Sequence, residues 1–300
     1  MKKVIFSFIT GLMFFSCTKI VQIDIEQTKP KLVINGLFNT DSIWEVEISL
    51  SRYIYHNTPL ELIDDAIVTI KDSDNNSYDL NNQGDGIYTS ITEKPIIGKQ
   101  YTIEVFHPSH DDVNAINQLP SSIAITNLDW QEQVLVDGEL KRNVKITFQD
   151  SPENDYYVLR IFAHSWEVEF IDTIYEQQPV YFSSQNAAIE NKNDNGFYSS
   201  TNFTDALFNG DEYVMDVLVD EYYFTGEKEE FRDKGYGIDS ISIVFSKVSE
   251  EYYWYETSYQ SFLSSRYSFA QPVQVYSNIE NGHGIFAGYS TTKETIDLTD

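Results

Sequence analysis

The sequence predicts a mainly β protein built from two β-sandwich domains, the first immunoglobulin-like, with one short helix in the C-terminal half. Aromatic residues are frequent, with 21 Tyr and 19 Phe among 300 residues, and such residues favour strands over helices. Short segments that alternate apolar and polar residues recur along the chain and are separated by turns rich in Asp, Asn and Gly. This pattern is typical of an immunoglobulin-like sandwich.

The first residues have the features of a bacterial lipoprotein signal. Two lysines precede a run of apolar and small residues, 4–15, which is shorter than the roughly 20 residues that a transmembrane helix needs. The following Ser16-Cys17 resembles a lipobox, in which the thiol is acylated and the chain is cut before it. Phe stands at the two preceding positions, where the usual pattern has Leu and a small residue. We expect 1–16 to be a signal peptide.

The alternative is an ordinary secretory signal in which the cysteine stands by chance. Cys17 is the only cysteine of the chain, whereas a secreted protein stabilised by disulfides carries an even set. Its position directly after the apolar run favours a lipidation site. Residues 17–30 are then expected to form a lipid-anchored tether.

The first domain is expected over residues 31–125. Its predicted strands are 32–36, 44–50, 66–70, 78–80, 87–89 and 99–106, because each has the two-residue period or the β-branched content of a strand. Polar turns at 71–77 and 82–86 separate some of them. The pattern pauses near Leu119-Pro120, so the domain boundary is expected between 120 and 130.

The second β-rich domain is expected over residues 126–300. Its predicted strands are 144–148, 156–163, 167–174, 212–219 and 240–245. The segment 183–211 is rich in Asn, Asp and Ser and is expected to be a long loop or insertion.

One helix is expected after Ser249, which is a good N-cap residue followed by two glutamates. Four aromatic residues lie on one face of this helix: Tyr252, Tyr255, Tyr259 and Phe262. Packing of this stripe against a sheet is favoured over a role as a ligand platform.

The net charge excludes several partners. It is −27 for the whole chain and more negative once the two lysines of the signal are removed. Nucleic acid is excluded as a partner because phosphate binding needs clustered Lys and Arg. Adhesion to an anionic lipid surface is also disfavoured, so a covalent anchor is the better route to a membrane.

The C-terminal stretch 272–290 is the most distinctive part of the chain. A Pro-Val strand leads into Ser-Asn-Ile, a Gly-rich turn and Gly-Ile-Phe-Ala-Gly-Tyr. It resembles the close of a lipoprotein family of the Bacteroidota phylum, known as domain-of-unknown-function family 4249. The strand 31–38 (KLVINGLF), the segment 66–70 (AIVTI) and the segment 154–157 (NDYY) agree in order with that family.

The resemblance implies an outer-membrane lipoprotein without an established activity. It also implies the company of TonB-dependent β-barrel transporters and favours the cell surface over the periplasmic face. The motif positions, which are candidate binding residues, are Asn278, Gly282, Gly284, Phe286 and Gly288. His283 stands in the turn where the family has an apolar residue.

Two short clusters have residue types that ligate metal ions. Asp72, Asp74 and Asn76 form the oxygen-rich start of a calcium loop, but the Gly expected at the sixth position is missing, so a polar hairpin turn is favoured. His107 and His110 have a spacing found in metal sites, but their Pro and Ser neighbours favour an exposed loop. No metal or cofactor is assigned.

No catalytic motif is found. Cys17 is taken by the lipid, and the chain has no Gly-x-Ser-x-Gly elbow. Carboxylate pairs for glycoside hydrolysis could arise among 47 acidic residues, which makes them uninformative. The favoured hypothesis is a non-catalytic envelope protein that acts by binding, as an accessory to an outer-membrane transporter or in a surface assembly. The alternatives are a carbohydrate- or peptide-active hydrolase with its site in 183–211, and an adhesin or structural module.

The lipidation site gives a direct prediction. Cys17→Ser should leave an unprocessed or soluble protein, because the acylated thiol is the expected anchor. The measurement is labelling of cells with radioactive palmitate, followed by membrane fractionation. A variant that still carries label and sediments with the membrane would contradict the lipobox interpretation.

Overall fold

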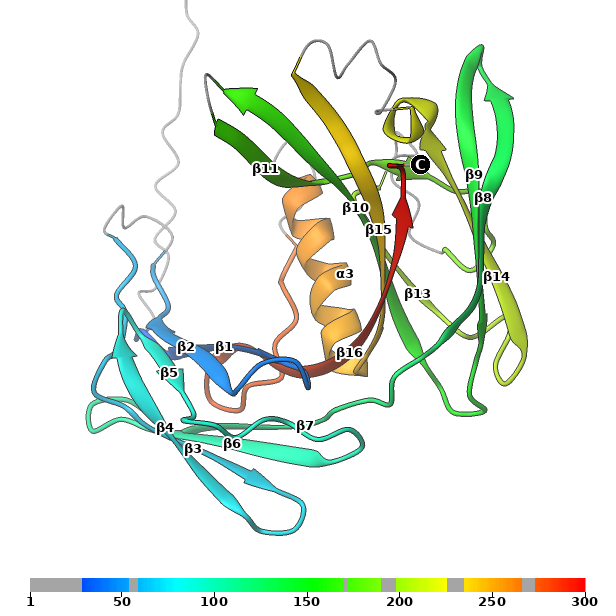
Figure 1. Cartoon of the computed structure of the whole chain (residues 1–300). Coiled ribbons are helices and arrows are strands. Elements are labelled where there is room, and N and C mark those ends of the chain that lie inside the picture. Colours follow the sequence, from blue (N-terminus) through cyan, green and yellow to red (C-terminus); the bar gives the residue numbers. More distant parts are fainter. Residues whose placement is uncertain are drawn as a thin grey trace, which may run out of the picture.

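The computed structural model describes residues 29–53, 59–169, 172–189, 198–225, 235–265 and 273–299. The predicted signal peptide, Cys17 and nearly all of the predicted tether lie outside these ranges. Within them the chain is mainly β with one α-helix, which confirms the predicted fold class (Figure 1). No helix in this described part is long and apolar enough to cross a membrane.

Seven strands form the first lobe. They are β1 (Leu32–Phe38), β2 (Glu45–Leu50), β3 (Ile67–Asp72), β4 (Ser77–Gly84), β5 (Ile87–Thr89), β6 (Gln100–Phe106) and β7 (Val113–Gln118). They are hydrogen-bonded in the order β1-β2-β5-β4-β3-β6-β7, so that β4 joins two halves of a sandwich. The core holds an aromatic group in which Trp44 lies 4.9 Å from Phe38 and 4.7 Å from Tyr101 between ring centroids.

The second lobe is a sandwich of two sheets. Its strands are β8 (Ile125–Val136), β9 (Glu139–Gln149), β10 (Tyr156–Glu169), β11 (Asp172–Pro179), β12 (Phe182–Ser183), β13 (Ser200–Thr204), β14 (Glu212–Asp220) and β15 (Tyr236–Val248). One sheet has the order β12-β14-β9-β8, and the other contains β11, β10 and β15, with β13 beside β10. Buried apolar residues from both sheets form one core between them. A short 3-10 helix, η2 (Glu221–Phe224), follows β14.

The last strand, β16 (His283–Asp297), belongs to both lobes. Its residues 283–288 pair in parallel with β1, and its residues 289–297 pair antiparallel with β15. One strand therefore joins the lobes into a continuous 12-stranded sheet (Figure 1). Phe286 packs in the core of the first lobe and Ile296 in that of the second. The division into domains 31–125 and 126–300 stays a prediction, because this strand contributes to both cores.

The helix α3 (Glu250–Ser265) begins where the sequence predicts. The Ser249 Oγ accepts a hydrogen bond from the Tyr252 backbone N–H at 3.3 Å, so Ser249 caps the helix. Tyr252 and Tyr253 are buried against β10, β15 and β16. The expected stripe packs only in part, because Tyr255 and Tyr259 stack on each other with a centroid distance of 5.9 Å and Tyr259 is 38% exposed.

Two local predictions are wrong. The predicted strand 167–174 spans two strands, because β10 continues to Glu169 and β11 starts at Asp172. The predicted long loop 183–211 contains β13 and contributes buried side chains to the second core, including Tyr198, Phe203 and Phe208. Aromatic residues spaced among polar ones can pack inward even when the segment's average composition is polar.

The parallel pairing of β16 with β1 depends on a glycine. Gly284 has φ +103°, and a Cβ at this position would lie 2.0 Å from the carbonyl oxygen of Ile34. Only glycine fits, because any side chain would meet the backbone of β1 and the φ value disfavours L residues.

Gly284→Ala should destabilise the protein more than Gly84→Ala. Gly84 has a similar φ of +93° but no atom within 4 Å of an added Cβ. Both changes cost about 1–3 kcal/mol in backbone strain, and overpacking adds about 1–3 kcal/mol only at Gly284. Urea denaturation measures both free energies of unfolding. Equal losses would contradict the proposed close contact with Ile34.

Candidate functional site

The predicted lipidation site, Cys17, lies outside the described residues, so its role stays a prediction. The calcium candidates lie in the turn between β3 and β4. Asp72 is buried, and its Oδ1 accepts the backbone N–H groups of Asp74 and Asn76 at 3.0 and 2.9 Å. Its Oδ2 accepts the Asn76 side-chain N–H, the Tyr78 hydroxyl and the Lys99 ammonium at 2.8–3.0 Å.

These contacts explain the turn without a metal ion. Hydrogen bonds from Asn76 and Lys99 hold the pKa of Asp72 well below its usual range. The ammonium of Lys99 also lies 2.8 Å from a carboxylate oxygen of Asp74, and the two carboxylates raise the pKa of Lys99. Since a cation already lies between the carboxylates, the geometry favours the hairpin-turn interpretation over calcium ligation.

The histidine pair is placed differently from the prediction. His107 is buried, with 7% exposure, and does not lie on an open loop. Its Nε2 lies 3.0 Å from Asp65 Oδ1, and its Nδ1 accepts the Ser109 backbone N–H at 3.1 Å. The His110 ring packs beside it at 4.9 Å between centroids. Both ring nitrogens of His107 thus have protein partners, one in its own loop and one in the segment before β3, which favours a structural role.

The family-motif positions gather around the first half of β16. The Asn278 side chain bridges to Phe286, donating to its carbonyl at 2.7 Å and accepting its N–H at 3.0 Å. A Cβ on Gly282 would lie 2.8 Å from the Leu32 carbonyl oxygen. A Cβ on Gly288 would lie 2.8 Å from the carbonyl oxygen of Gln118. These positions let β16 pass close to β1 and β7, so the structure gives them a packing role.

One buried asparagine ties three elements together. Asn117, at the end of β7, accepts the Gly288 N–H at 2.8 Å and donates to Glu251 of α3 at 2.5 Å. Asn117 is only 4% exposed. Its amide therefore fixes β7, β16 and α3 relative to one another.

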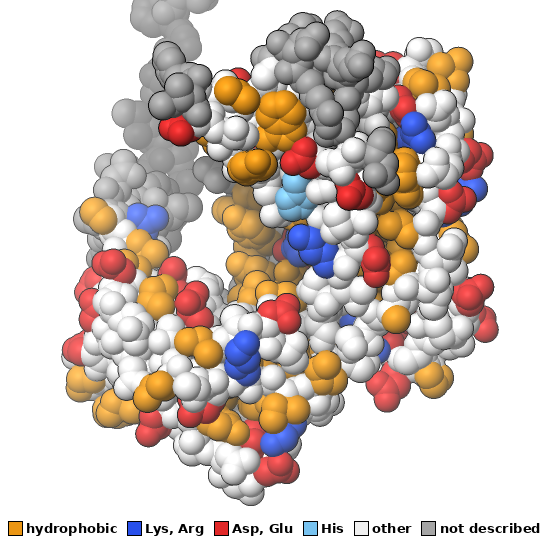
Figure 2. Space-filling view, viewed as in Figure 1, with side chains coloured by type: hydrophobic (Ala, Val, Ile, Leu, Met, Phe, Trp, Pro, Cys, Tyr) orange, Lys and Arg blue, Asp and Glu red, His pale blue; other side chains and the backbone are white. Residues whose placement is uncertain are grey.

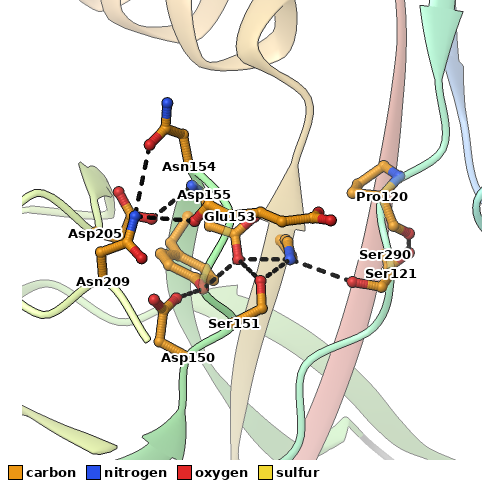
Figure 3. A network of polar contacts seen from close by, with 12 residues as sticks. Pro120, Ser121, Asp150, Ser151, Glu153, Asn154, Asp155, Asp205, Asn209 and Ser290 are labelled. Atoms are coloured by element: carbon orange, nitrogen blue, oxygen red, sulfur yellow. Dashed lines mark hydrogen bonds and ion pairs between the residues drawn. The ribbon is translucent and has the colours of Figure 1, made fainter. Parts of the chain in front are cut away.

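The described residues hold one further cluster, which sequence patterns did not predict. Asp150, Asp155 and Asp205 are all buried, and one carboxylate oxygen from each lies within 4.8 Å of the others. They come from the end of β9, the start of β10 and the segment after β13, as Figure 3 shows. The Lys247 ammonium of β15 lies 2.6 Å from Asp155 Oδ2 and is also buried. We call the three acids the aspartate cluster.

Neighbouring hydrogen-bond donors occupy the carboxylate oxygens of the aspartate cluster. Ser151 donates to Asp155 at 2.5 Å, and the Gly210 N–H donates to Asp150 at 2.8 Å. The Lys247 ammonium reaches the hydroxyls of Ser121 and Ser151, each at 3.2 Å (Figure 3). Because Ser121 lies between the two lobes, the cluster also ties the connecting segment to the second lobe.

The electrostatics of the cluster are those of a buried site. Tyr157 donates to Asp150, and burial together with this bond raises the pKa of Tyr157. Burial also raises the pKa of Asp205, whose Oδ2 accepts the Asp155 backbone N–H at 2.7 Å. Three carboxylates so close together could hold a metal ion, but Lys247 already supplies a cation. The arrangement can stabilise the fold, and its burial closes it to a substrate.

A serine–histidine pair lies on the face opposite the second core. His164 Nε2 and Ser242 Oγ are 2.6 Å apart, a distance suited to a nucleophile and its base. Burial lowers the pKa of His164. Ser242 has no exposed surface, so a substrate cannot reach its hydroxyl. The pair has the spacing but not the access of a catalytic site.

A groove beside α3 is the described surface best suited to binding. It is lined by Trp254, Thr257, Ser258 and Ser261 of the helix and by residues 273–277. We call it the α3 groove. Trp254 is 45% and Val273 is 36% exposed. Figure 2 shows hydrophobic side chains in the recess between the two lobes, where α3 lies.

Comparison with known proteins gives a family match. The model of the family described as "Domain of unknown function (DUF4249)" matches residues 18–295. No curated protein matches the chain. Among solved structures, 16 chains match. One is titled "Biofilm associated protein - BSP domain", with 7% sequence identity and a TM-score of 0.22. That match covers 93% of this chain and 62% of the other, so the chain spans less than two thirds of it.

Lys247→Met should destabilise the protein by about 3–5 kcal/mol, because it leaves the charge of Asp155 buried without a partner. Adding Asp155→Asn should recover part of this loss, since the uncompensated charge is then removed. Lys71→Met is the control: Lys71 and Glu104 are about half exposed, and such pairs contribute about 0–1 kcal/mol. Chemical denaturation measures all three variants. Similar losses for Lys247→Met and Lys71→Met would contradict the structural role.

Proposed function

Because the chain belongs to the DUF4249 family, we propose that it is a non-catalytic, lipid-anchored protein of the cell envelope that acts by binding. Its partner is an outer-membrane transporter of the TonB-dependent β-barrel type or another component of a surface assembly. The α3 groove is the observation that carries this proposal. It combines an exposed tryptophan with apolar side chains from a neighbouring segment.

The α3 groove has the composition of a protein contact. Exposed Trp and Tyr residues dominate binding energy at interfaces because they bury much area and lose few rotamers. Trp254 lies at the groove, and the stacked Tyr255 and Tyr259 lie on the same helix. The buried Tyr252 and Tyr253 pack the helix against β10, β15 and β16. The groove is therefore presented on a rigid support, which lowers the entropy cost of binding.

The membrane anchor is supported by the sequence and by the range of the family match. The match starts at residue 18, directly after Cys17, so the segment that we expect to be removed lies before it. The net charge of −27 gives the protein no attraction of its own to anionic lipids. A lipid on Cys17 would hold it at the outer membrane. We favour the cell surface, in keeping with the family's implied association with transporters.

A hydrolase is the weaker candidate. Among the described residues, the aspartate cluster and Ser242 resemble catalytic groups, and both are buried. The segment 183–211, where a hydrolytic site was expected, contributes Tyr198, Phe203 and Phe208 to the second core. These observations count against a hydrolytic site at those positions.

Purification of the lipidated protein from its native membrane tests the proposal. The wild-type protein should recover a β-barrel partner in a stoichiometric ratio. Trp254→Asp should raise the dissociation constant roughly thirtyfold, the effect expected when a tryptophan at the centre of an interface is lost, and so lower the recovered amount of the partner.

Ile91→Asp is the matched control. Ile91 is 78% exposed on the first lobe, so the change of an apolar residue to an acid is the same but lies away from the groove. This variant should keep the partner. Recovery of the wild-type protein alone would overturn the transporter proposal. Equal loss of the partner in both variants would show that the α3 groove is not the contact.

A further inference from the structure

The strand β11 ends the 12-stranded sheet with an open edge. It pairs with β10 on one side only, and no described residue pairs with its other side. All eight of its residues, 172–179, are exposed. Figure 1 shows β11 at the outer margin of the sheet, in a hairpin with β10. Its outward N–H and C=O groups form a row that an extended chain can pair with.

Alternate residues of β11 face a pocket. Ile174, Glu176 and Gln178 line it from β11, together with Ser165 and Glu167, which belong to β10. These positions lie on the inner face of the sheet, because Gln178 pairs with Ala163, a residue of the second core. Tyr222 of η2 also lines the pocket. The pocket therefore lies at the open end of the second sandwich, and we call it the β11 pocket.

The β11 pocket is acidic where a sandwich interior is normally apolar. Its described lining contains Glu167, Glu169 and Glu176 and no Lys, Arg or His. The sequence from 161 to 191 contains no Lys or Arg. The cavity has a volume of about 260 Å³, which is below the usual range of roughly 300–1,000 Å³ for small-molecule sites. This size suits side chains that enter from an adjoining peptide.

We propose that the edge of β11 binds an extended, basic segment of a partner protein, which adds to the sheet as a further strand. Its main chain pairs with the open edge. Its alternate Lys or Arg side chains reach the carboxylates of Glu167, Glu169 and Glu176 in the β11 pocket. This mode is β-strand addition, in which main-chain bonds give affinity and alternate side chains give specificity. The inference rests on the proposed function, that the protein acts by binding, and names the chemistry of a partner.

Charge selects this occupant over a second copy of the chain. The charged residues of β11, Asp172 and Glu176, are both acidic, so two paired copies of the strand could offer each other only like charges, which destabilise a sheet where they lie opposite each other. A net charge of −27 adds repulsion between two whole chains. A basic segment instead neutralises the pocket.

The probe is a fluorescent eight-residue peptide of alternating Arg and Thr, measured by fluorescence anisotropy with the full chain. The wild-type protein should bind it, with affinity falling as salt increases. The triple variant Glu167→Gln, Glu169→Gln and Glu176→Gln should bind roughly tenfold more weakly, because three exposed ion pairs are lost. A peptide with Glu in place of Arg should not bind.

Two controls separate charge from strand addition. Glu45→Gln, Glu61→Gln and Glu280→Gln together remove the same charge elsewhere and should leave binding unchanged. Two further peptides are methylated on alternate backbone nitrogens, one on the odd and one on the even positions, and both keep their charge. Because a strand directs only alternate N–H groups toward a given edge, at least one of these two peptides should lose binding. Equal weakening by both triple variants, or full binding of both methylated peptides, would overturn the proposal.

Other occupants would also overturn it. The segment 226–234, outside the described residues, contains Lys228, Arg232 and Lys234. If the peptide probe binds only after these three basic residues are changed to Gln, the β11 pocket is occupied by this segment of the same chain and not by a partner protein. A wild-type dimer in sedimentation that the pocket variant abolishes would point to a second copy. Failure of the peptide experiment leaves the pull-down with Trp254→Asp unaffected, so the two proposals fail separately.

Discussion

The pairing of β16 with two different strands is the constraint on which the rest of the structure depends. Residues 283–288 lie beside β1 and residues 289–297 beside β15, so one strand sets the position of each lobe relative to the other. Asn117 then fixes α3 to this strand. The α3 groove exists because the segment 273–277, which leads into β16, is held against the helix, with the Tyr276 N–H donating to Ser258 Oγ at 2.8 Å. Both proposed binding surfaces therefore belong to one continuous sheet and the helix on it.

Local patterns predict much of this fold, because they depend on neighbouring residues. The alternation at 44–50 predicts β2, and Ser249 predicts the start of α3. The partner of β1 is not predictable in the same way. It lies about 250 residues away, and the glycines that permit the contact look like an ordinary turn in the sequence. Averages over polar segments also mislead, since Tyr198 and Phe203 are core residues within a stretch that is polar overall.

The candidate sites follow the same rule. Asp72, with the turn that follows it, satisfies its own hydrogen bonds locally, so the sequence already favours a turn there. The aspartate cluster depends on contacts across the fold. Asp150 and Asp155 are recognisable as ends of a turn, but Asp205, from the segment after β13, and Lys247 of β15 reach them from far along the chain. With 47 acidic residues, no spacing distinguishes the few that meet from the many that do not. The neighbouring Pro and Ser residues predict an exposed loop for His107. In the structure, contacts with Asp65 and with its own loop bury the ring.

The proposed lipid anchor lowers the affinity that each binding surface needs for its partner. Cys17 and Lys29, where the described chain begins, are twelve residues apart, which spans at most about 40 Å when extended. A protein held so near the membrane meets a membrane-embedded partner at an effective concentration of the order of millimolar. A groove with one exposed tryptophan, and a strand edge beside a pocket with three glutamates, would each bind weakly in free solution. Tethered to the same membrane as their partner, two such contacts reinforce each other, because the second forms within an existing complex. Weak, separate surfaces on a rigid sheet are thus sufficient for a lipid-anchored accessory protein, and no deep pocket is required.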